Sequence, residues 1–476
     1  MASSSYDVVI VGAGLSGLQA ALDVQQAGLK YLVLEARDRV GGKTLSLRST
    51  HKVVKSELGA AWINDTNQSE MWKLAQELRL NTYAQNTVGD VVVQDVDGSL
   101  VRFPYGDVPK YSSAEDTASC IAIRDLVQEV STSHSPSIFS DGPHRVQLDS
   151  ISFETYLHEA KVTPKAFATA QVWTHAMVGC DPSELSALCF LEYCAAGGGL
   201  MTMRSDGKGG GQYLRIREGT SAFAEGMADK LAPGALKLQS PVASITQAQR
   251  EGSVLVMTKG QNPQTFRARK VVVSIPTPVY KTIAFSPPLA PCKTAVANRT
   301  RYGFYTKYIV TFRRAFWLEK NHCGLAQSFT GPISVIRDTS LDDGKTYALT
   351  CFMGGQFGRR WAAQGAEGKK RSVLKQIGEI FSADCIDVVT DLFVEASESP
   401  WMEEEYSGWG CPCPVTPPGV LAGDAWNALC APAGNLHFVG TELSSVWRGY
   451  MEGAVRSGSR GAAEVIAELT RVSPKL

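Results

Sequence analysis

The chain has 476 residues, more than one hydrophobic core usually supports, so we expect two large domains. Hydrophobic residues make up 44% and charged residues 20%, which is typical of a soluble globular protein. The 47 basic and 47 acidic residues balance, which argues against nucleic acid or a membrane surface as partner and favours a small substrate with little or no charge.

The cysteines and the two ends of the chain bear on its compartment. Eleven cysteines, an odd number, suit no disulfide framework. The opening "MASSSYDVVIVGAG" lacks the basic region of a signal peptide, and no stretch approaches the roughly 20 apolar residues of a membrane helix. The last residues, Pro474-Lys475-Leu476, resemble the peroxisomal signal Ser-Lys-Leu except at the proline. We therefore expect no membrane anchor and a peroxisomal, otherwise cytoplasmic, protein, with a homodimer as the candidate assembly.

The first predicted elements form a βαβ unit. An apolar strand at residues 8–11 meets a glycine turn, then an Ala- and Leu-rich helix, then the strand "YLVLE". Gly12, Gly14 and Gly17 form G-x-G-x-x-G, which allows a tight turn, close approach of a pyrophosphate and close helix packing. Glu35 follows at the end of the second strand, where a carboxylate can accept both ribose hydroxyls. This pattern predicts dinucleotide binding.

A second glycine turn follows the acidic residue. In "EARDRVGGKTLS", Arg37 precedes Gly41, Gly42 and Lys43. NAD-binding folds have no regular use for this second basic turn, so it favours FAD over NAD.

The remaining elements alternate between two kinds of region. Residues 195–211, "AAGGGLMTMRSDGKGGG", predict a mobile glycine-rich loop. Strand signals return over 236–275, and the chain closes with the strand "NLHFVG" and a long helix. These patterns predict an α/β protein with a discontinuous Rossmann-like FAD domain and a mixed α+β substrate domain. The predicted FAD domain uses residues 5–85, 215–300 and 395–470, and the predicted substrate domain uses 86–214 and 301–394.

Lys307 lies in the apolar strand "FYTKYIV". A lysine there is costly to bury unless its charge has a function. The alternative is a lysine on the solvent face of the strand.

Two cysteines lie one residue apart in the proline-rich stretch "SGWGCPCPVTPPG". Zinc needs about four ligands, and no second pair of cysteines accompanies Cys411 and Cys413. A disulfide across one residue would be strained. A redox pair, an attachment point and two incidental thiols stay open on the residues alone.

Several longer stretches resemble the flavin-containing amine oxidases, most closely the fungal monoamine oxidases of the N type. They include "VIVGAGLSGL", "LVLEARDRVGGKT", "ELGAAWINDTNQS", "GGGQYLR", "KVVVSIPTPVY" and "HFVGTELSSVWRGYMEGAVRSGSRGAAEVI", and they run along nearly the whole chain. The resemblance implies FAD, with Glu35 on the ribose and Val242 on the adenine. Lys43 departs from the arginine usual in the family. The further cofactor contacts that the resemblance implies are Ala61, Trp62, Gly440, Thr441, Glu442 and Met451.

The resemblance also implies roles near the flavin ring. Lys307 falls on the family lysine that holds a water at flavin N5, where a fixed cation would stabilise negative charge on oxygen. In animal monoamine oxidases, a cysteine six residues before a Pro-Pro-Gly turn bonds through sulfur to the flavin 8α-methyl. Cys411 lies six residues before Pro417, whereas Cys413 does not fit. The resemblance therefore implies covalent FAD through Cys411.

Tyr450 matches one wall of the family's aromatic cage, two rings that flank the amine. The position of the second wall directly follows the tether cysteine and is Pro412 here. Trp409 is the ring closest in sequence and is our candidate for a replacement wall.

These features predict oxidation of an amine C–N bond by FAD, with oxygen as acceptor and hydrogen peroxide as product. The missing wall favours a bulky or secondary amine as the small-molecule substrate. Three alternatives remain: a flavin-dependent dehydrogenase or oxidative cyclase of a fungal secondary-metabolite (alkaloid) pathway, a related desaturase, and a non-catalytic flavin-fold protein.

Overall fold

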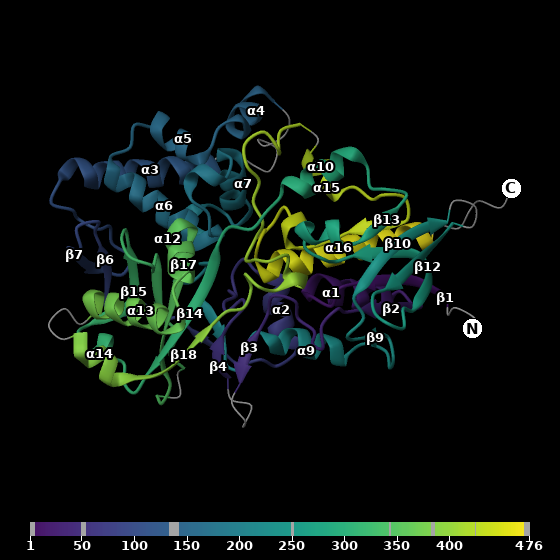
Figure 1. Ribbon diagram of the computed structural model, residues 1–476, viewed down its shortest axis with the longest axis horizontal. Helices are drawn as coiled ribbons and strands as arrows, with labels where there is room; N and C mark the ends of the chain where they lie inside the picture. The colour runs from purple at the N-terminus through teal and green to yellow at the C-terminus, as the bar shows by residue number, and fades with distance from the viewer. Residues whose placement is uncertain are drawn as a thin grey trace.

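The computed structural model describes residues 5–48, 54–132, 142–248, 252–341, 344–381, 386–423 and 425–470. The tripeptide on which the peroxisomal prediction depends, 474–476, lies outside the described residues. Two β-sheets, each with its own helices, lie next to each other along the longest axis of the molecule (Figure 1).

The first sheet has eight strands and is built around β1. Strands β12 and β2 flank β1 in parallel, so that Val9 lies opposite Val271 on one side and Leu32 on the other. All three residues are fully buried, as expected for parallel strands covered on both faces. The strands are β1 (Ser5–Val11), β2 (Tyr31–Leu34), β9 (Leu236–Lys237), β10 (Val242–Ala248), β11 (Ser253–Thr258), β12 (Thr265–Val273), β13 (Ala284–Ser286) and β19 (Leu436–Phe438).

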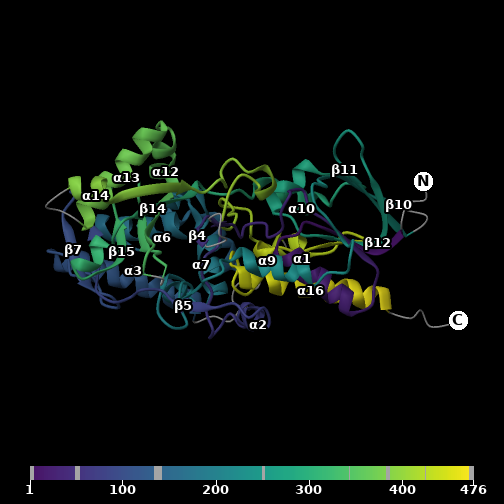
Figure 2. The same cartoon turned by 90° about the horizontal axis from the view of Figure 1, so that it is seen from below.

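Helices α1 (Leu15–Gln26) and α16 (Met451–Thr470) pack closely on one face of this sheet, beside α9 (Ser221–Asp229) (Figure 2). The close approach depends on a glycine. A Cβ added at Gly458 would lie 2.3 Å from the backbone oxygen of Ser16. The two helices therefore join the two ends of the chain in one layer.

The second sheet has seven strands in the order β18, β14, β17, β16, β15, β6, β7. Strands β14 and β17 pair antiparallel, with Lys307 opposite Phe352. Helices α3 to α7 gather beyond this sheet (Figure 1). The strands are β6 (Asp90–Gln94), β7 (Leu100–Pro104), β14 (Tyr305–Phe312), β15 (His322–Ser328), β16 (Val335–Asp338), β17 (Tyr347–Gly354) and β18 (Phe393–Glu398).

Shorter elements connect and cover the two sheets. The small strands are β3 (Ser46–Arg48), β4 (Val54–Glu57), β5 (Thr82–Ala84) and β8 (Leu214–Ile216). The other α-helices are α2 (Ser69–Glu77), α3 (Ala114–Thr132), α4 (Pro143–Ser150), α5 (Phe153–Glu159), α6 (Pro164–Val178), α7 (Ala187–Ala196), α8 (Leu200–Arg204), α10 (Pro291–Arg299), α11 (Phe316–Glu319), α12 (Gly355–Ala362), α13 (Ala366–Phe381), α14 (Ile386–Leu392) and α15 (Ala425–Cys430). The 3-10 turns are η1 (Pro182–Glu184), η2 (Thr277–Thr282), η3 (Glu405–Ser407) and η4 (Thr441–Leu443).

The structure confirms the predicted βαβ unit and corrects the predicted loop at 195–211. Strands β1 and β2 pair in parallel around α1. The loop prediction was wrong over Leu200–Arg204, which form helix α8. Leu200 and Met203 are buried and fix this turn of helix, while Gly199, the residue before α8, adopts a φ of +105° that favours glycine. The domain boundaries themselves stay a prediction.

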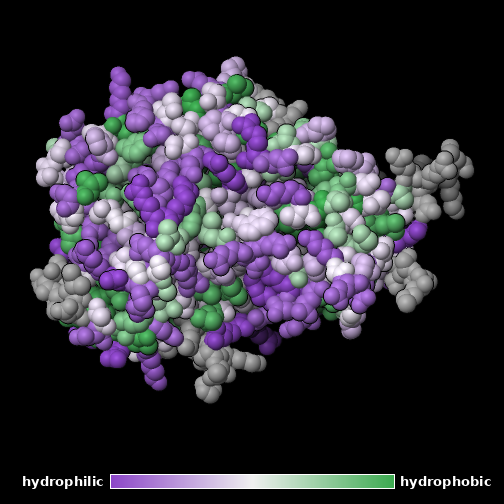
Figure 3. Space-filling model, in the orientation of Figure 1, coloured by the Kyte–Doolittle hydropathy of each residue, from purple (hydrophilic) through white to green (hydrophobic). Residues whose placement is uncertain are grey.

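The surface is mostly hydrophilic on the face shown in Figure 3, with hydrophobic residues in small scattered groups. In the part of the chain that the structure describes, no helix is both long and apolar enough to cross a membrane.

Candidate active site

A cavity of about 340 Å³ is lined by residues from both sheets. It brings together most of the residues that the sequence singled out, although they come from all parts of the chain. Those that line it are Gly12, Gly14, Glu35, Arg37, Gly41, Gly42, Lys43, Ala61, Trp62, Val242, Lys307, Cys411, Gly440, Thr441, Glu442, Tyr450 and Met451. Gly17 and Trp409 lie outside this lining.

At one end of the cavity, the two glycine turns pack against each other. Gly14 and Gly41 form an isolated parallel bridge, and the amide of Gly41 donates to the oxygen of Ala13 at 2.8 Å. A Cβ on Gly42 would lie 3.2 Å from the Cα of Gly14. Bare backbone at the start of α1 therefore faces the cavity, where free amides favour an anion. This arrangement fits the pyrophosphate of FAD.

The Glu35 carboxylate is held beside these turns. It accepts from the amide of Ala13 at 2.7 Å and from the amide of Arg37 at 3.0 Å. The guanidinium of Arg37 forms an ion pair with Glu404 at 3.0 Å, so its positive charge does not serve Glu35 alone. Val242 lines the same end. A fixed acid in this position fits a ribose.

The third glycine of the motif acts through packing. We expect Gly17→Ala to lower the free energy of unfolding by about 1–3 kcal/mol, because overpacking forces the backbone to shift. A Cβ at Gly17 would lie 2.0 Å from the backbone oxygen of Gly12. Gly14→Ala is the matched control, since its nearest neighbour would be Gly42 Cα at 3.9 Å. Urea unfolding of protein prepared without flavin should show the loss in Gly17→Ala alone, while Gly14→Ala instead lowers flavin binding, measured by flavin absorbance. Equal stability of the two variants would contradict the packing role.

Lys43 is a cation that directly follows the second glycine turn. Its Nζ donates to the hydroxyl of Tyr302 and lies 3.9 Å from the centre of that ring. Burial lowers the pKa of Lys43 to about 8, and the nearby carboxylate of Glu442 acts in the other direction. Glu442 is itself held by the amide of Thr277 at 2.8 Å. Lys43 can therefore supply positive charge, but without the two parallel hydrogen bonds that an arginine forms with an anion.

Lys307 lies in the interior, not on the solvent face of β14. Its Nζ donates to the backbone oxygens of Glu57, at 3.2 Å, and Gly59. It lies 5.4 Å from the centre of the Trp62 ring. Burial lowers the pKa of Lys307 to about 8, and the buried carboxylate of Glu57 opposes that shift. The ammonium is thus fixed at the cavity wall.

The two neighbouring cysteines differ in where they point. Cys411 lines the cavity, with its thiol 3.8 Å from the backbone oxygen of Tyr305. Cys413 does not line it. Its Cβ lies close to Gly449, where an added Cβ would come within 2.9 Å of it. Both thiols are free, and burial raises the pKa of Cys411 to about 12. Only Cys411 is placed to meet a group in the cavity.

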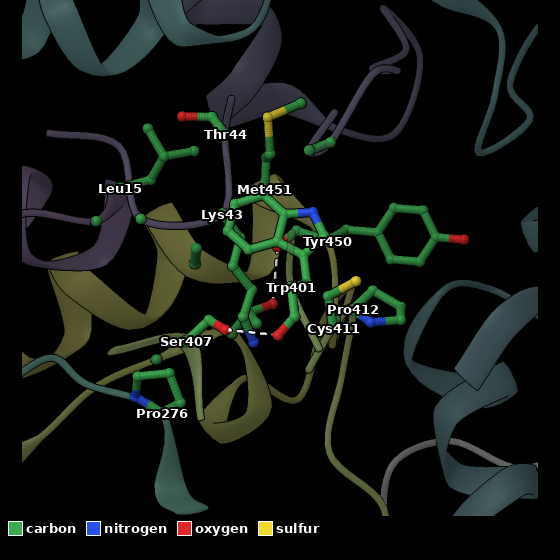
Figure 4. Close-up of a pocket in the computed structure, with 18 of the residues that line it drawn as sticks. Leu15, Lys43, Thr44, Pro276, Trp401, Ser407, Cys411, Pro412, Tyr450 and Met451 are labelled. Atoms are coloured by element: carbon green, nitrogen blue, oxygen red, sulfur yellow. Dashed lines mark hydrogen bonds between the residues drawn. The ribbon is translucent and has the colours of Figure 1, made fainter. Parts of the chain in front are cut away.

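Figure 4 shows the ring of Tyr450 beside Cys411 and Pro412. Trp409 does not supply a second wall, so that expectation is corrected. Its backbone has φ 55°, its side chain is 39% exposed, and the Nζ of Lys281 lies 5.4 Å from the ring centre. The chain turns this ring to the surface. Other rings that line the cavity were not identified from the sequence: Trp173, Tyr193, Tyr305, Phe352, Trp401 and Tyr406.

Sequence reasoning also missed a polar group at the substrate end. Arg337, in β16, donates to Asp206 at 2.8 Å and to the side-chain oxygen of Gln212 at 3.4 Å. Gln212 in turn lies 3.5 Å from the hydroxyl of Tyr450. Arg204, from α8, lines the same cavity. An arginine inside the apolar run "PISVIRD" is the one signal that would have indicated Arg337, for the same reason as Lys307.

Comparison with known proteins decides the family. A model of the flavin containing amine oxidoreductases matches residues 15–466. The chain belongs to the flavin-containing amine oxidoreductases. It is 32% identical to a flavin-containing amine oxidase of Oncorhynchus mykiss, over 99% of this chain and 88% of that protein. It is 31% identical to flavin-containing amine oxidase B of Homo sapiens, over 99% and 88% of the two chains.

Solved structures of two amine oxidases share the fold. Cyclohexylamine oxidase from Brevibacterium oxydans is 27% identical with a TM-score of 0.88, over 98% of this chain and 100% of that one. A putrescine oxidase variant, 24% identical over 97% and 99% of the two chains, also has a TM-score of 0.88 and shows the likeness of fold alone. The expected two-domain α/β flavoprotein fold is confirmed. The protein is an amine oxidase, an oxidoreductase acting on small-molecule amines, and its family implies FAD.

Proposed function

We propose that this amine oxidase converts a bulky or secondary amine to the imine and reduces oxygen to hydrogen peroxide. The observation that supports this substrate class is Pro412, which lies beside Tyr450 at the cavity wall where the family places a second ring. An aromatic wall contributes about 0.5–1.5 kcal/mol beyond its buried area. Without it, a larger amine can fill the space and make contacts of its own.

We further propose which residues hold FAD. The glycine turns and Lys43 would bind the phosphates, Glu35 the ribose, and Val242 the adenine. Thr441, at the start of η4, and Met451, at the start of α16, would lie against the ring, and Cys411 would bond to it. The cofactor supplies hydride acceptance and the transfer of two electrons to oxygen.

The residues of the chain orient the amine and control water. Tyr450 and its neighbouring rings hold the α-carbon in the near-contact geometry that hydride transfer requires. The α C–H bond breaks with its electron pair, the nitrogen lone pair forms the C=N bond, and the imine then hydrolyses or is captured by an internal nucleophile. Lys307 keeps a positive charge at the cavity wall, donating to Glu57 and Gly59, and is suited to hold a water there.

The substrate preference is directly measurable. We expect catalytic efficiency on ring-containing secondary amines, such as tetrahydroisoquinoline, to exceed that on short primary amines by about tenfold, the equivalent of one lost aromatic wall. Steady-state peroxide assays across both classes give the values. The opposite order by tenfold would show that the remaining rings complete the cage.

The same assays separate an oxidase from a flavin-dependent dehydrogenase or oxidative cyclase. An oxidase consumes one oxygen per amine and releases one peroxide. Turnover only with an added electron acceptor would favour the dehydrogenase. The buried cation of Lys307 supports the oxidase, since it would stabilise charge on oxygen.

A further inference from the structure

The substrate end of the cavity contains more positive than negative charge. Arg337 and Arg204 both line it, and the Asp206 carboxylate acts on both charges but forms its ion pair with Arg337. Asp206 is 2% exposed and donates its amide to the hydroxyl of Tyr105 at 2.8 Å. One guanidinium is therefore neutralised and one is not.

Arg337 is the neutralised arginine. Its Nε lies 2.8 Å from Asp206, and its other end reaches Gln212. These contacts fix its plane, and its guanidinium lies 5.8 Å from the centre of the Trp62 ring. Through Gln212, it also orients the hydroxyl of Tyr450.

Arg204 has a different environment. Its guanidinium lies 5.2 Å from the centre of the Trp173 ring, and no carboxylate among the described residues comes within ion-pair distance of it. Burial and the charge of Arg337 lower its pKa to about 10, so it stays protonated at neutral pH. Helix α8 fixes it at the cavity, because Leu200 and Met203 on that turn are buried.

The surroundings of Arg204 select its counterion. The Trp173 ring that faces Arg204 belongs to an apolar cluster that also lines the cavity, with Met177, Leu325, Val335 and Phe352. An uncompensated cation in such a site is costly and repels a simple alkylammonium ion. A negative group on the substrate would remove that cost. One net positive charge matches a monoanion better than a dianion, and the planar guanidinium matches a carboxylate in two parallel hydrogen bonds.

We propose that the substrate amine also carries a carboxylate, which binds Arg204 while its amine-bearing carbon faces Tyr450. This deepens the proposed function and rests on it. The zero net charge of the whole chain does not argue against an anionic substrate, because binding depends on the charge of the residues around the carboxylate.

A binding experiment tests the anion site without turnover. Calorimetry of the holoenzyme with para-methylbenzoate, its neutral amide and para-tolylphosphonate should give the tightest binding for the benzoate. Arg204→Met should weaken benzoate binding about 10- to 100-fold and leave the amide unchanged, as expected for loss of hydrogen bonds to a charged group. Arg217→Met removes an exposed arginine outside the cavity and is the matched control. Equal binding of benzoate and amide, tighter binding of the phosphonate, or an unchanged Arg204→Met variant would overturn the proposal.

A kinetic experiment adds the substrate. The cyclic secondary amine 1,2,3,4-tetrahydroisoquinoline-7-carboxylate should have a KM about tenfold or more below that of its methyl ester in wild type, and Arg204→Met should bring the two KM values together. Arg204→Lys should restore part of the difference. If neither amine is oxidised although benzoate binds as expected, the proposed function fails and the anion site stands. If both are oxidised equally well, the anion site fails and the oxidase stands.

Discussion

Replacing Lys307 with methionine is expected to slow reoxidation of the reduced enzyme by oxygen about 100-fold, while anaerobic reduction by amine stays nearly unchanged. Removing one preorganised charge-stabilising group typically costs a factor of this size. The backbone oxygens of Glu57 and Gly59 fix the ammonium at the cavity wall. Stopped-flow mixing of reduced protein with oxygenated buffer measures the rate.

The pH dependence gives a second reading of the same residue. The pKa of Lys307 is lowered to about 8, so the ammonium is charged below that pH and neutral above it. Reoxidation should therefore slow as the pH rises through about 8, and Lys307→Met should lose this dependence. Lys43→Met is the matched control, because it removes another buried cation of similar pKa from the cavity. Lys43→Met should lower the flavin content and leave the rate of reoxidation by oxygen unchanged. Slower reoxidation in Lys43→Met but not in Lys307→Met would show that Lys43, and not Lys307, has this role.

Cys411→Ala is expected to change the flavin from acid-stable to acid-extractable in all molecules. Only this thiol of the pair lines the cavity. Forming a C–S bond at the flavin 8α-methyl carbon is a two-electron oxidation, and oxygen, the proposed acceptor of the enzyme, takes those electrons. Acid precipitation followed by mass analysis of flavin-bearing peptides measures attachment.

The neighbouring cysteine provides the control. Cys413→Ala removes a buried thiol of the same loop but should leave the flavin attached. Cys413 packs against Gly449, which lines the cavity, but Cys413 itself does not line it. A colourless wild-type pellet would refute the tether, and loss of attachment in Cys413→Ala would assign it to the other thiol.

Features with a local signal could be predicted from the sequence. The glycine motif, the strand ending before Glu35 and the long final helix each depend on residues close in the chain, and the structure has all three. Lys307 could be singled out because an apolar strand does not bury a lysine without reason. The spacing to Pro417 separated Cys411 from Cys413, and their orientation toward and away from the cavity agrees with that distinction.

Features that depend on distant contacts could not be predicted in the same way. The partner of Arg337 is Asp206, 131 residues earlier, so its charge balance has no trace in the local sequence. Helix α8 lies among glycines and forms because Leu200 and Met203 meet a core built by other segments. Trp409 turns outward at a positive φ of 55° in a residue other than glycine, which no local pattern indicates.

The shared layer of α1 and α16 makes folding of this enzyme strongly non-local. In strand β1, Val9 pairs with Val271 of β12, which lies 271 − 9 = 262 residues later in the chain, and the covering helix α16 begins only at Met451. During synthesis, the chain therefore exposes a Val- and Ile-rich central strand until β12 has been made, with the aggregation hazard that non-local pairing brings. Because Thr441 and Met451 line the cavity, flavin can be enclosed only after the chain has been made beyond Met451. Enclosure of the cofactor is thus a late step in producing active protein.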